Sequence, residues 1–138
     1  SRMDNLQAAF LNVKFKFLDE YLKRREEIAE KYRALKGVGL PSYGGGRVWQ
    51  DYIIRIPTDR MAYDPDILPR SYSRNRLYDF LKEEGIETLK NEYPFTPEYP
   101  KLPNAAIYEA ETLRIPCNPD LTDEEVEYVI SAINSWTG

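Results

Sequence analysis

The chain has 138 residues, of which 42% are hydrophobic and 30% charged, a balance typical of one globular domain and not of a disordered chain. Its formal net charge of −4 argues against a general nucleic-acid binder, although residues 1–36 carry more basic than acidic side chains. The chain has no histidine, which excludes Ser-His-Asp and Cys-His catalysis and histidine-based zinc sites within it.

The cysteine content and the lengths of the apolar runs indicate where in the cell the protein is located. The single cysteine, Cys117, cannot form an internal disulfide, and no apolar run approaches the length of a membrane span or resembles a signal peptide. These features predict a cytoplasmic protein that does not bind membranes. The chain starts with Ser1 and its helical pattern is under way at Leu6, so we expect a piece of a longer protein.

The first predicted element is one long amphipathic helix over residues 5–36. Asp4 or Asn5 caps its start, and Gly37, followed by Gly39 and Pro41, ends it. A helix of this length spans about 45 Å, more than the width of such a domain, so it overhangs the domain or packs along a partner. Its apolar side chains recur at spacings of three, four and seven: Leu6, Phe10, Val13, Phe17, Tyr21, Ile28, Tyr32 and Leu35.

A turn and a strand follow the helix. Three consecutive glycines, Gly44 to Gly46, favour a flexible turn over a phosphate-binding loop, because no Gly-Lys-Ser/Thr follows and the stretch runs into a strand. Residues 48–56 alternate in polarity, which predicts a strand with one well-buried face. That face carries Val48, Gln50, Tyr52, Ile54 and Ile56, while Trp49, Asp51, Ile53 and Arg55 lie on the other.

The rest of the chain alternates between short helices and short strands. Ser73 is the predicted cap of a helix with core positions Leu77, Phe80 and Leu81 that stops at Gly85. Next come a short strand over residues 86–89, an extended proline-rich stretch over 94–103, a helix over 105–111 and a strand over 112–116. Thr122 and Glu125 form a capping box before a last helix whose apolar stripe is Val126, Val129, Ile130, Ile133 and Trp136.

These elements predict one domain over residues 1–138 of the α/β class, with an α+β-like arrangement. We expect a long N-terminal helix and a small, mostly antiparallel sheet with helices packed on one face. The order of elements contains no internal repeat and no second domain.

No group of residues predicts a self-sufficient active site. An acidic cluster (Asp120, Asp123, Glu124, Glu125 and Glu127) is explained by helix capping better than by metal binding. Cys117 has no histidine to activate it and is interpreted as a structural thiol. The lysines of the first helix (Lys14, Lys16, Lys23, Lys31 and Lys36) lack the apolar surroundings that a Schiff base needs. Among the aromatic residues, Tyr93 and Tyr99 are the plausible ligand contacts.

Four segments in order carry a resemblance to a known family. Ser1–Ala9 is similar to the end of an Asn-x-Arg-Met/Leu-x-x-x-Gln-Ala-Ala motif, and Arg25–Tyr32 to an Arg-x-x-Ile-Ala-x-x-Tyr repeat. Leu77–Thr88 resembles Leu-x-x-x-Leu-x-x-x-Gly-Ile-x-Thr, and Leu113–Ile130 resembles a Leu-x-Leu-Pro…Leu-Thr-x-Glu-Glu-Val ending. Together they resemble the DegT/StrS nucleotide-sugar aminotransferases, which are pyridoxal-phosphate (PLP) enzymes with the fold-type-I, aspartate-aminotransferase fold.

The resemblance implies that the chain is the C-terminal small domain of such an enzyme, with helix 5–36 bridging to a large domain absent here. That large domain holds PLP and the Schiff-base lysine, so no catalytic, cofactor-binding or metal residue is expected in this chain, which should be inactive alone. The whole enzyme would be a homodimer. It would pass an amino group from an amino donor to a keto group of a nucleotide sugar, in polysaccharide or antibiotic sugar biosynthesis.

The resemblance also implies three substrate contacts. Arg2 follows the position of an asparagine that, in the family, reaches the cofactor phosphate of the neighbouring subunit. Glu92-Tyr93-Pro94 matches a His-Tyr-Pro segment that lines the sugar site, so Tyr93 carries over and Glu92 replaces the histidine.

Two alternatives stay open. Because Glu92 would meet hydroxyl or amine groups differently from histidine, a fold-type-I PLP enzyme acting on a non-sugar substrate is one of them. The length of the first helix and the truncated start fit the other, a non-catalytic α/β interaction module.

Overall fold

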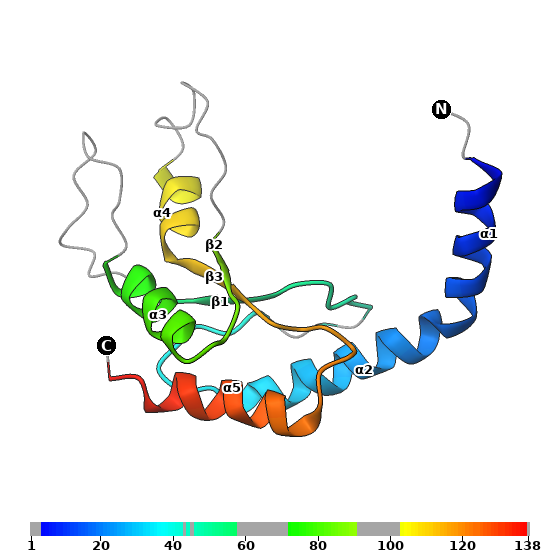
Figure 1. Cartoon of the computed structure of the whole chain (residues 1–138). Helices are drawn as coiled ribbons and strands as arrows, with labels where there is room; N and C mark the ends of the chain where they lie inside the picture. Colours follow the sequence, from blue (N-terminus) through cyan, green and yellow to red (C-terminus); the bar gives the residue numbers. More distant parts are fainter. Residues whose placement is uncertain (1–3, 43, 45, 58–71, 91–102, 138) are drawn as a thin grey trace.

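A computed structural model describes residues 4–42, 44, 46–57, 72–90 and 103–137, and Figure 1 draws the remaining residues in grey. The described part is a body of helices around a small sheet, from which the N-terminal helix projects (Figure 1). None of the helices in the described ranges is both long enough and apolar enough to span a membrane.

The predicted helix over residues 5–36 forms, but in four pieces: α1 (Asn5–Lys14), the 3₁₀ helix η1 (Phe15–Phe17), α2 (Leu18–Lys31) and the 3₁₀ helix η2 (Tyr32–Ala34). Asp4 is the cap, and its carboxylate accepts a hydrogen bond from the backbone N–H of Leu6 at 3.2 Å. The helix bends around η1 (Figure 1), because a tighter 3₁₀ turn interrupts the α-helical hydrogen-bond pattern. Gly37, with φ of 74°, follows its end as predicted.

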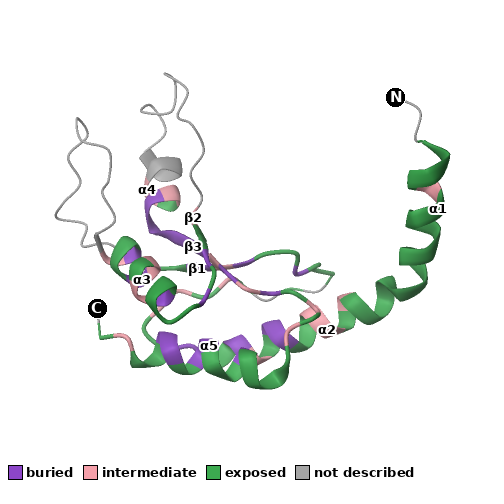
Figure 2. Ribbon diagram, in the orientation of Figure 1, coloured by how far each residue is buried: buried purple, intermediate pink, exposed green. Residues whose placement is uncertain are grey.

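The apolar stripe of this helix is buried only toward its C-terminal end. None of the ten residues of α1, all of them described, is buried, whereas Ile28 and Ala29 of α2 and Tyr32 of η2 are fully buried. Figure 2 shows this change along the helix, from exposed α1 to the buried positions of α2. The helix therefore overhangs the body, which is one of the two outcomes its length predicted.

In the described part of the chain, the sheet has three strands, β1 (Tyr52–Arg55), β2 (Leu89–Lys90) and β3 (Thr112–Ile115), in the order β1-β3-β2. Both pairings are antiparallel, which confirms the predicted sheet type. In the register, Tyr52 lies opposite Ile115 and Ile54 opposite Leu113, and all four side chains are buried. The opposite face carries Ile53, Arg55 and Arg114, none of which is buried, and also Thr112, which lies opposite Arg55 and is fully buried.

Both predicted outer strands differ in extent from the sheet that forms. β1 is shorter than residues 48–56, and Val48, expected on the buried face, is 63% exposed. β2 starts at the last residue of the range 86–89. An alternating sequence becomes a strand only where a neighbouring backbone is within hydrogen-bonding reach. Among the described residues, β3 pairs with residues 52–55 and 89–90.

Three further helices form, namely α3 (Tyr72–Glu83), α4 (Pro103–Glu111) and α5 (Asp123–Ser135). The prediction of Ser73 as a cap was wrong, because α3 begins at Tyr72 and includes Ser73. α4 begins two residues before the predicted start, at Pro103, since proline is well tolerated in a first helical turn. The other residues of the predicted proline-rich stretch, 94–102, lie outside the described residues.

The core lies between one face of the sheet and the helices α2, α3 and α5. Its buried residues include Ile28, Tyr32, Tyr52, Ile54, Leu77, Leu81, Leu113, Val126, Val129 and Ile133. This confirms helices on one face of the sheet. The first helix also holds α5 at its far end, where the side chain of Asn134 donates to the carbonyl of Ala34 (3.1 Å) and accepts from the N–H of Lys36 (2.7 Å).

Candidate functional site

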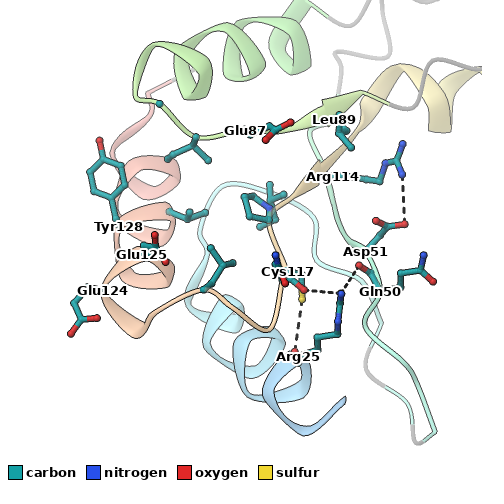
Figure 3. A pocket seen from close by; sticks show the side chains of 17 residues that line it. Arg25, Gln50, Asp51, Glu87, Leu89, Arg114, Cys117, Glu124, Glu125 and Tyr128 are labelled. Atoms are coloured by element: carbon teal, nitrogen blue, oxygen red, sulfur yellow. Dashed lines mark hydrogen bonds and ion pairs between the residues drawn. The ribbon is translucent and has the colours of Figure 1, made fainter. Parts of the chain in front are cut away.

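A hollow of about 840 Å³ lies between the β2–β3 edge of the sheet and the first turns of α5 (Figure 3). Its size is in the range of small-molecule sites. Its floor is apolar and its rim is charged. The charged residues are Arg25, Asp51, Glu87, Arg114, Glu124 and Glu125.

Arg25 is committed to the protein's own backbone. Its Nη1 donates to the carbonyl oxygens of Trp49 (3.0 Å), Gln50 (2.8 Å) and Cys117 (2.8 Å). These bonds fasten α2 to the chain before β1 and to the chain after β3, and Figure 3 shows those to Gln50 and Cys117. Arg25 therefore acts as a structural clamp through its Nη1.

Arg114 belongs to the central strand, β3, and lies on the face of the sheet opposite the core helices α2, α3 and α5. Its Nη1 lies 3.6 Å from Oδ2 of Asp51, an ion pair drawn in Figure 3. The Nε of Arg114 is buried and has no hydrogen-bond partner among the described residues. The pair links β3 to the segment before β1.

The acidic residues at the start of α5 serve capping, as predicted. The Thr122 side chain accepts from the N–H of Glu125 (3.2 Å), whose carboxylate accepts from the N–H of Thr122 (2.8 Å). Asp123 pairs with Lys31 (3.0 Å) and Arg24 (2.8 Å), and hydrogen bonds from these two cations lower the pKa of its carboxyl. In the described ranges, no group of three or more acidic or cysteine side chains could hold a metal ion.

Cys117 is buried at the base of the hollow. Burial raises the pKa of its thiol to about 11, and the nearby Arg25 offsets only part of this shift. A thiol of this pKa stays protonated near neutral pH and is a poor nucleophile. The burial supports the interpretation of Cys117 as a structural thiol.

A second hollow, of about 540 Å³, lies on the uncovered face of the sheet, between β1, the segment before it and α4. Arg47 and Arg55 line it together with the ring of Tyr108. The sequence placed Arg55 on the mixed face of a strand but gave no reason to group it with the other two, because they come from segments far apart in the chain.

The three substrate contacts implied by the resemblance, Arg2, Glu92 and Tyr93, lie outside the described residues. They stay predictions. Among the described residues, neither hollow is lined by a lysine, so neither offers the group to which PLP would be attached.

The chain matches the model of the DegT/DnrJ/EryC1/StrS aminotransferase family over residues 1–134. It is 29% identical to the dTDP-3-amino-3,6-dideoxy-alpha-D-galactopyranose transaminase of Aneurinibacillus thermoaerophilus, with 99% of this chain and 37% of the relative covered. It is 33% identical to the "pleiotropic regulatory protein" of Geobacillus stearothermophilus, over 96% of this chain and 37% of the relative.

A solved structure has the same fold. The crystal structure of S. venezuelae DesV in complex with a ketimine intermediate superposes with a TM-score of 0.76 at 27% identity, covering 98% of this chain and 37% of that one. The chain thus spans a little over a third of the length of the relatives it matches.

Proposed function

Since this chain belongs to the DegT/DnrJ/EryC1/StrS aminotransferase family, we propose that the whole protein is a PLP-dependent aminotransferase acting on a nucleotide-linked keto sugar. The family match over residues 1–134 carries the proposal. The name of the Aneurinibacillus relative, a transaminase of a dTDP-linked sugar, supports the nucleotide sugar as substrate class. The cytoplasmic location stays a prediction.

In this proposal the chain is the small domain, and helix 5–36 bridges to a large domain that holds PLP. Two observations support this role. The family match covers residues 1–134 while the chain spans only 37% of the Aneurinibacillus relative, and the projecting helix exposes large apolar side chains that water solvates poorly. These are Leu6, Phe10, Val13, Phe15 and Phe17, each between 46% and 65% exposed.

The proposed enzyme is a homodimer in which Arg2, Glu92 and Tyr93 contact the substrate. Their support is the resemblance of Ser1–Ala9 and of Glu92-Tyr93-Pro94 to family motifs. PLP, when bound, supplies the electron sink of the reaction, and the protein positions it. The cofactor belongs to the part of the enzyme outside the described residues.

The test is a turnover assay of the complete polypeptide that contains this sequence. Purified with PLP, it should change its cofactor absorbance with an amino donor and then again with a nucleotide-linked keto sugar. The 138-residue chain alone should show neither change. If the complete polypeptide turned over free oxo acids and no nucleotide-linked keto sugar, the substrate would be assigned as a non-sugar compound.

Tyr93→Phe in the complete enzyme tests the sugar contact. We expect slower turnover of the acceptor sugar with unchanged cofactor binding. The matched control is Tyr21→Phe, because Tyr21 is exposed on α2 and lines neither of the two hollows. If Tyr93→Phe and the unaltered enzyme turned over the acceptor sugar with equal kinetics, Tyr93 would not contact the sugar.

A non-catalytic interaction module is the second candidate, favoured by the regulatory name of the Geobacillus relative and by the exposed helix. This candidate would be supported if the complete polypeptide retained this fold but bound no PLP and turned over no sugar.

A further inference from the structure

The hollow on the uncovered face of the sheet is built by three separate segments. Its floor is β1, where Ile53 and Arg55 point away from the helix-covered core. One wall is residues 39–42, held to β1 by a pair of hydrogen bonds between Gly39 and Arg55 (2.7 and 2.8 Å). The opposite wall is α4, which contributes Tyr108.

The charged groups of this hollow are mainly cationic. Arg47 is exposed, and its Nη2 donates to the hydroxyl of Ser42 at 3.0 Å; its side chain makes no other hydrogen bond to a described residue. Arg55 pairs through Nε with the buried carboxylate of Glu111, and its side chain is still 47% exposed. The acidic residue in the lining, Asp51, is paired with Arg114. Both arginines thus keep N–H donors for a ligand, and guanidinium groups bind phosphate and carboxylate oxygens strongly.

The same hollow offers apolar and aromatic surface. Tyr108 is 53% exposed and Val48 63% exposed. The guanidinium of Arg47 lies 5.7 Å from the centre of the Trp49 ring, so the cation is held close to aromatic surface. A planar ring can stack on a tyrosine face or on a guanidinium plane.

The larger hollow beside α5 has the opposite charge. Its lining carries four carboxylates, Asp51, Glu87, Glu124 and Glu125, against two guanidinium groups, those of Arg25 and Arg114. An anion is therefore favoured at the Arg47–Arg55 hollow and opposed at the larger one.

We propose that the Arg47–Arg55 hollow binds an anionic ligand that carries a planar ring, of the nucleoside diphosphate class. The phosphate oxygens accept hydrogen bonds from Arg47 and Arg55, and the base packs on Tyr108. The choice of a nucleotide among such ligands rests on the proposed function, in which a nucleotide-linked sugar is the substrate. The binding site itself rests on the geometry above.

Binding is measured on the 138-residue chain with Trp136→Phe, which leaves Trp49 in the hollow as the sole tryptophan. Titrants are dTDP, thymidine and inorganic pyrophosphate, followed by fluorescence and calorimetry. We expect saturable quenching by dTDP, with thymidine and pyrophosphate each at least about ten-fold weaker, since each makes only one kind of contact. Added salt should weaken the binding of dTDP.

Variants assign the site to its residues. Arg47→Gln and Tyr108→Leu should each weaken dTDP binding, the former by about ten-fold. Arg76→Gln, an exposed arginine on α3 outside the hollow, is the matched control and should bind as before. Arg55 is left unchanged, because its Nε pairs with the buried carboxylate of Glu111 and its loss would destabilise the fold.

Three results would overturn the proposal: no saturable response to dTDP, equal binding of pyrophosphate and dTDP, or equal losses for Arg47→Gln and Arg76→Gln. Failure here leaves the aminotransferase proposal standing, because turnover of the complete enzyme measures that separately. An inactive complete enzyme whose small domain still bound dTDP would refute only the aminotransferase.

Discussion

Arg25 and Cys117 illustrate how reactive residue types serve structure in this chain. The guanidinium of Arg25 reaches three carbonyl oxygens, and one of them belongs to Cys117. The thiol in turn lies 3.8 Å from the carbonyl oxygen of Arg25. Hydrogen bonds of this kind replace the bonds to water that the carbonyls lose on folding. They stabilise the fold because an unpaired carbonyl would carry the full free-energy cost of its desolvation.

Arg25→Ala should therefore destabilise the chain strongly. Losing a charged donor to three carbonyls should lower the free energy of unfolding by about 2–3 kcal/mol, as measured by urea denaturation. The control is Arg33→Ala, which removes an exposed ion pair with Glu30 and should change it by less than about 0.5 kcal/mol. Equal effects of the two substitutions would contradict the clamp.

Cys117 should make the protein less stable in alkali. Its pKa is about 11 in the folded chain and lies at the ordinary value of 9.0 when unfolded. The contribution of the protonated thiol to the free energy of unfolding is thus complete below pH 9. It is lost as the pH rises toward 11, because the thiol of the unfolded chain releases its proton first. At pH 10 this loss is about 1 kcal/mol.

The measurement is urea denaturation of the chain and of Cys117→Ala at about pH 8 and pH 10. Cys117→Ala should show the smaller fall in free energy of unfolding between the two pH values. Tyr32, whose pKa is raised mainly by burial and further by Cys117, stays in both proteins, so the part due to its own burial cancels in the comparison. Identical falls would show that the thiol is not buried as described.

Among the elements, α3 ends through a local signal that the sequence already showed. Gly85 has φ of 75°, and its N–H and that of Ile86 donate to the carbonyls of Lys82 (3.1 Å) and Leu81 (2.8 Å). This is the Schellman arrangement, in which a left-handed residue turns the chain back over the last helical turn. The buried Ile86 then leads into the segment before β2.

Gly85→Ala should destabilise the chain by about 1 kcal/mol, because a Cβ disfavours the left-handed conformation. Crowding adds nothing, since a Cβ at Gly85 would meet no described atom within 4 Å. Gly44→Ala is the matched control, because its site is equally open but without the left-handed backbone, and we expect less than about 0.5 kcal/mol of change. Thermal denaturation followed by circular dichroism distinguishes the two.

At the scale of the whole molecule, the first helix belongs to the body at one end only. α2 packs Ile28 into the core, whereas α1 extends beyond it in Figure 1 with no buried residue among its ten. The free energy of folding of this chain should therefore depend on α2 and hardly on α1.

Deleting residues 1–10 should leave the free energy of unfolding within about 0.5 kcal/mol of the intact chain. Ile28→Ala on the same helix should lower it by about 2–4 kcal/mol, because the side chain is fully buried. Urea denaturation measures both. A deletion as harmful as Ile28→Ala would mean that α1 packs against the body in solution.

The sequence by itself determined the features that depend on neighbours along the chain. The Asp4 cap, the Thr122–Glu125 box and the stop at Gly85 follow from residues within about one turn of each other. The burial of Tyr52 and Ile54 follows from their alternation. The family came from four ordered motifs, and the substrate contacts drawn from them stay predictions outside the described residues.

Only the tertiary structure decided what distant segments do to one another. It confined β1 and β2 to the residues that β3 can pair, and left α1 without a packing surface. It also brought Arg25 to Cys117, and Arg47 and Tyr108 to the same hollow. These outcomes depend on contacts between residues far apart in sequence, whereas periodicity and capping report only local preference.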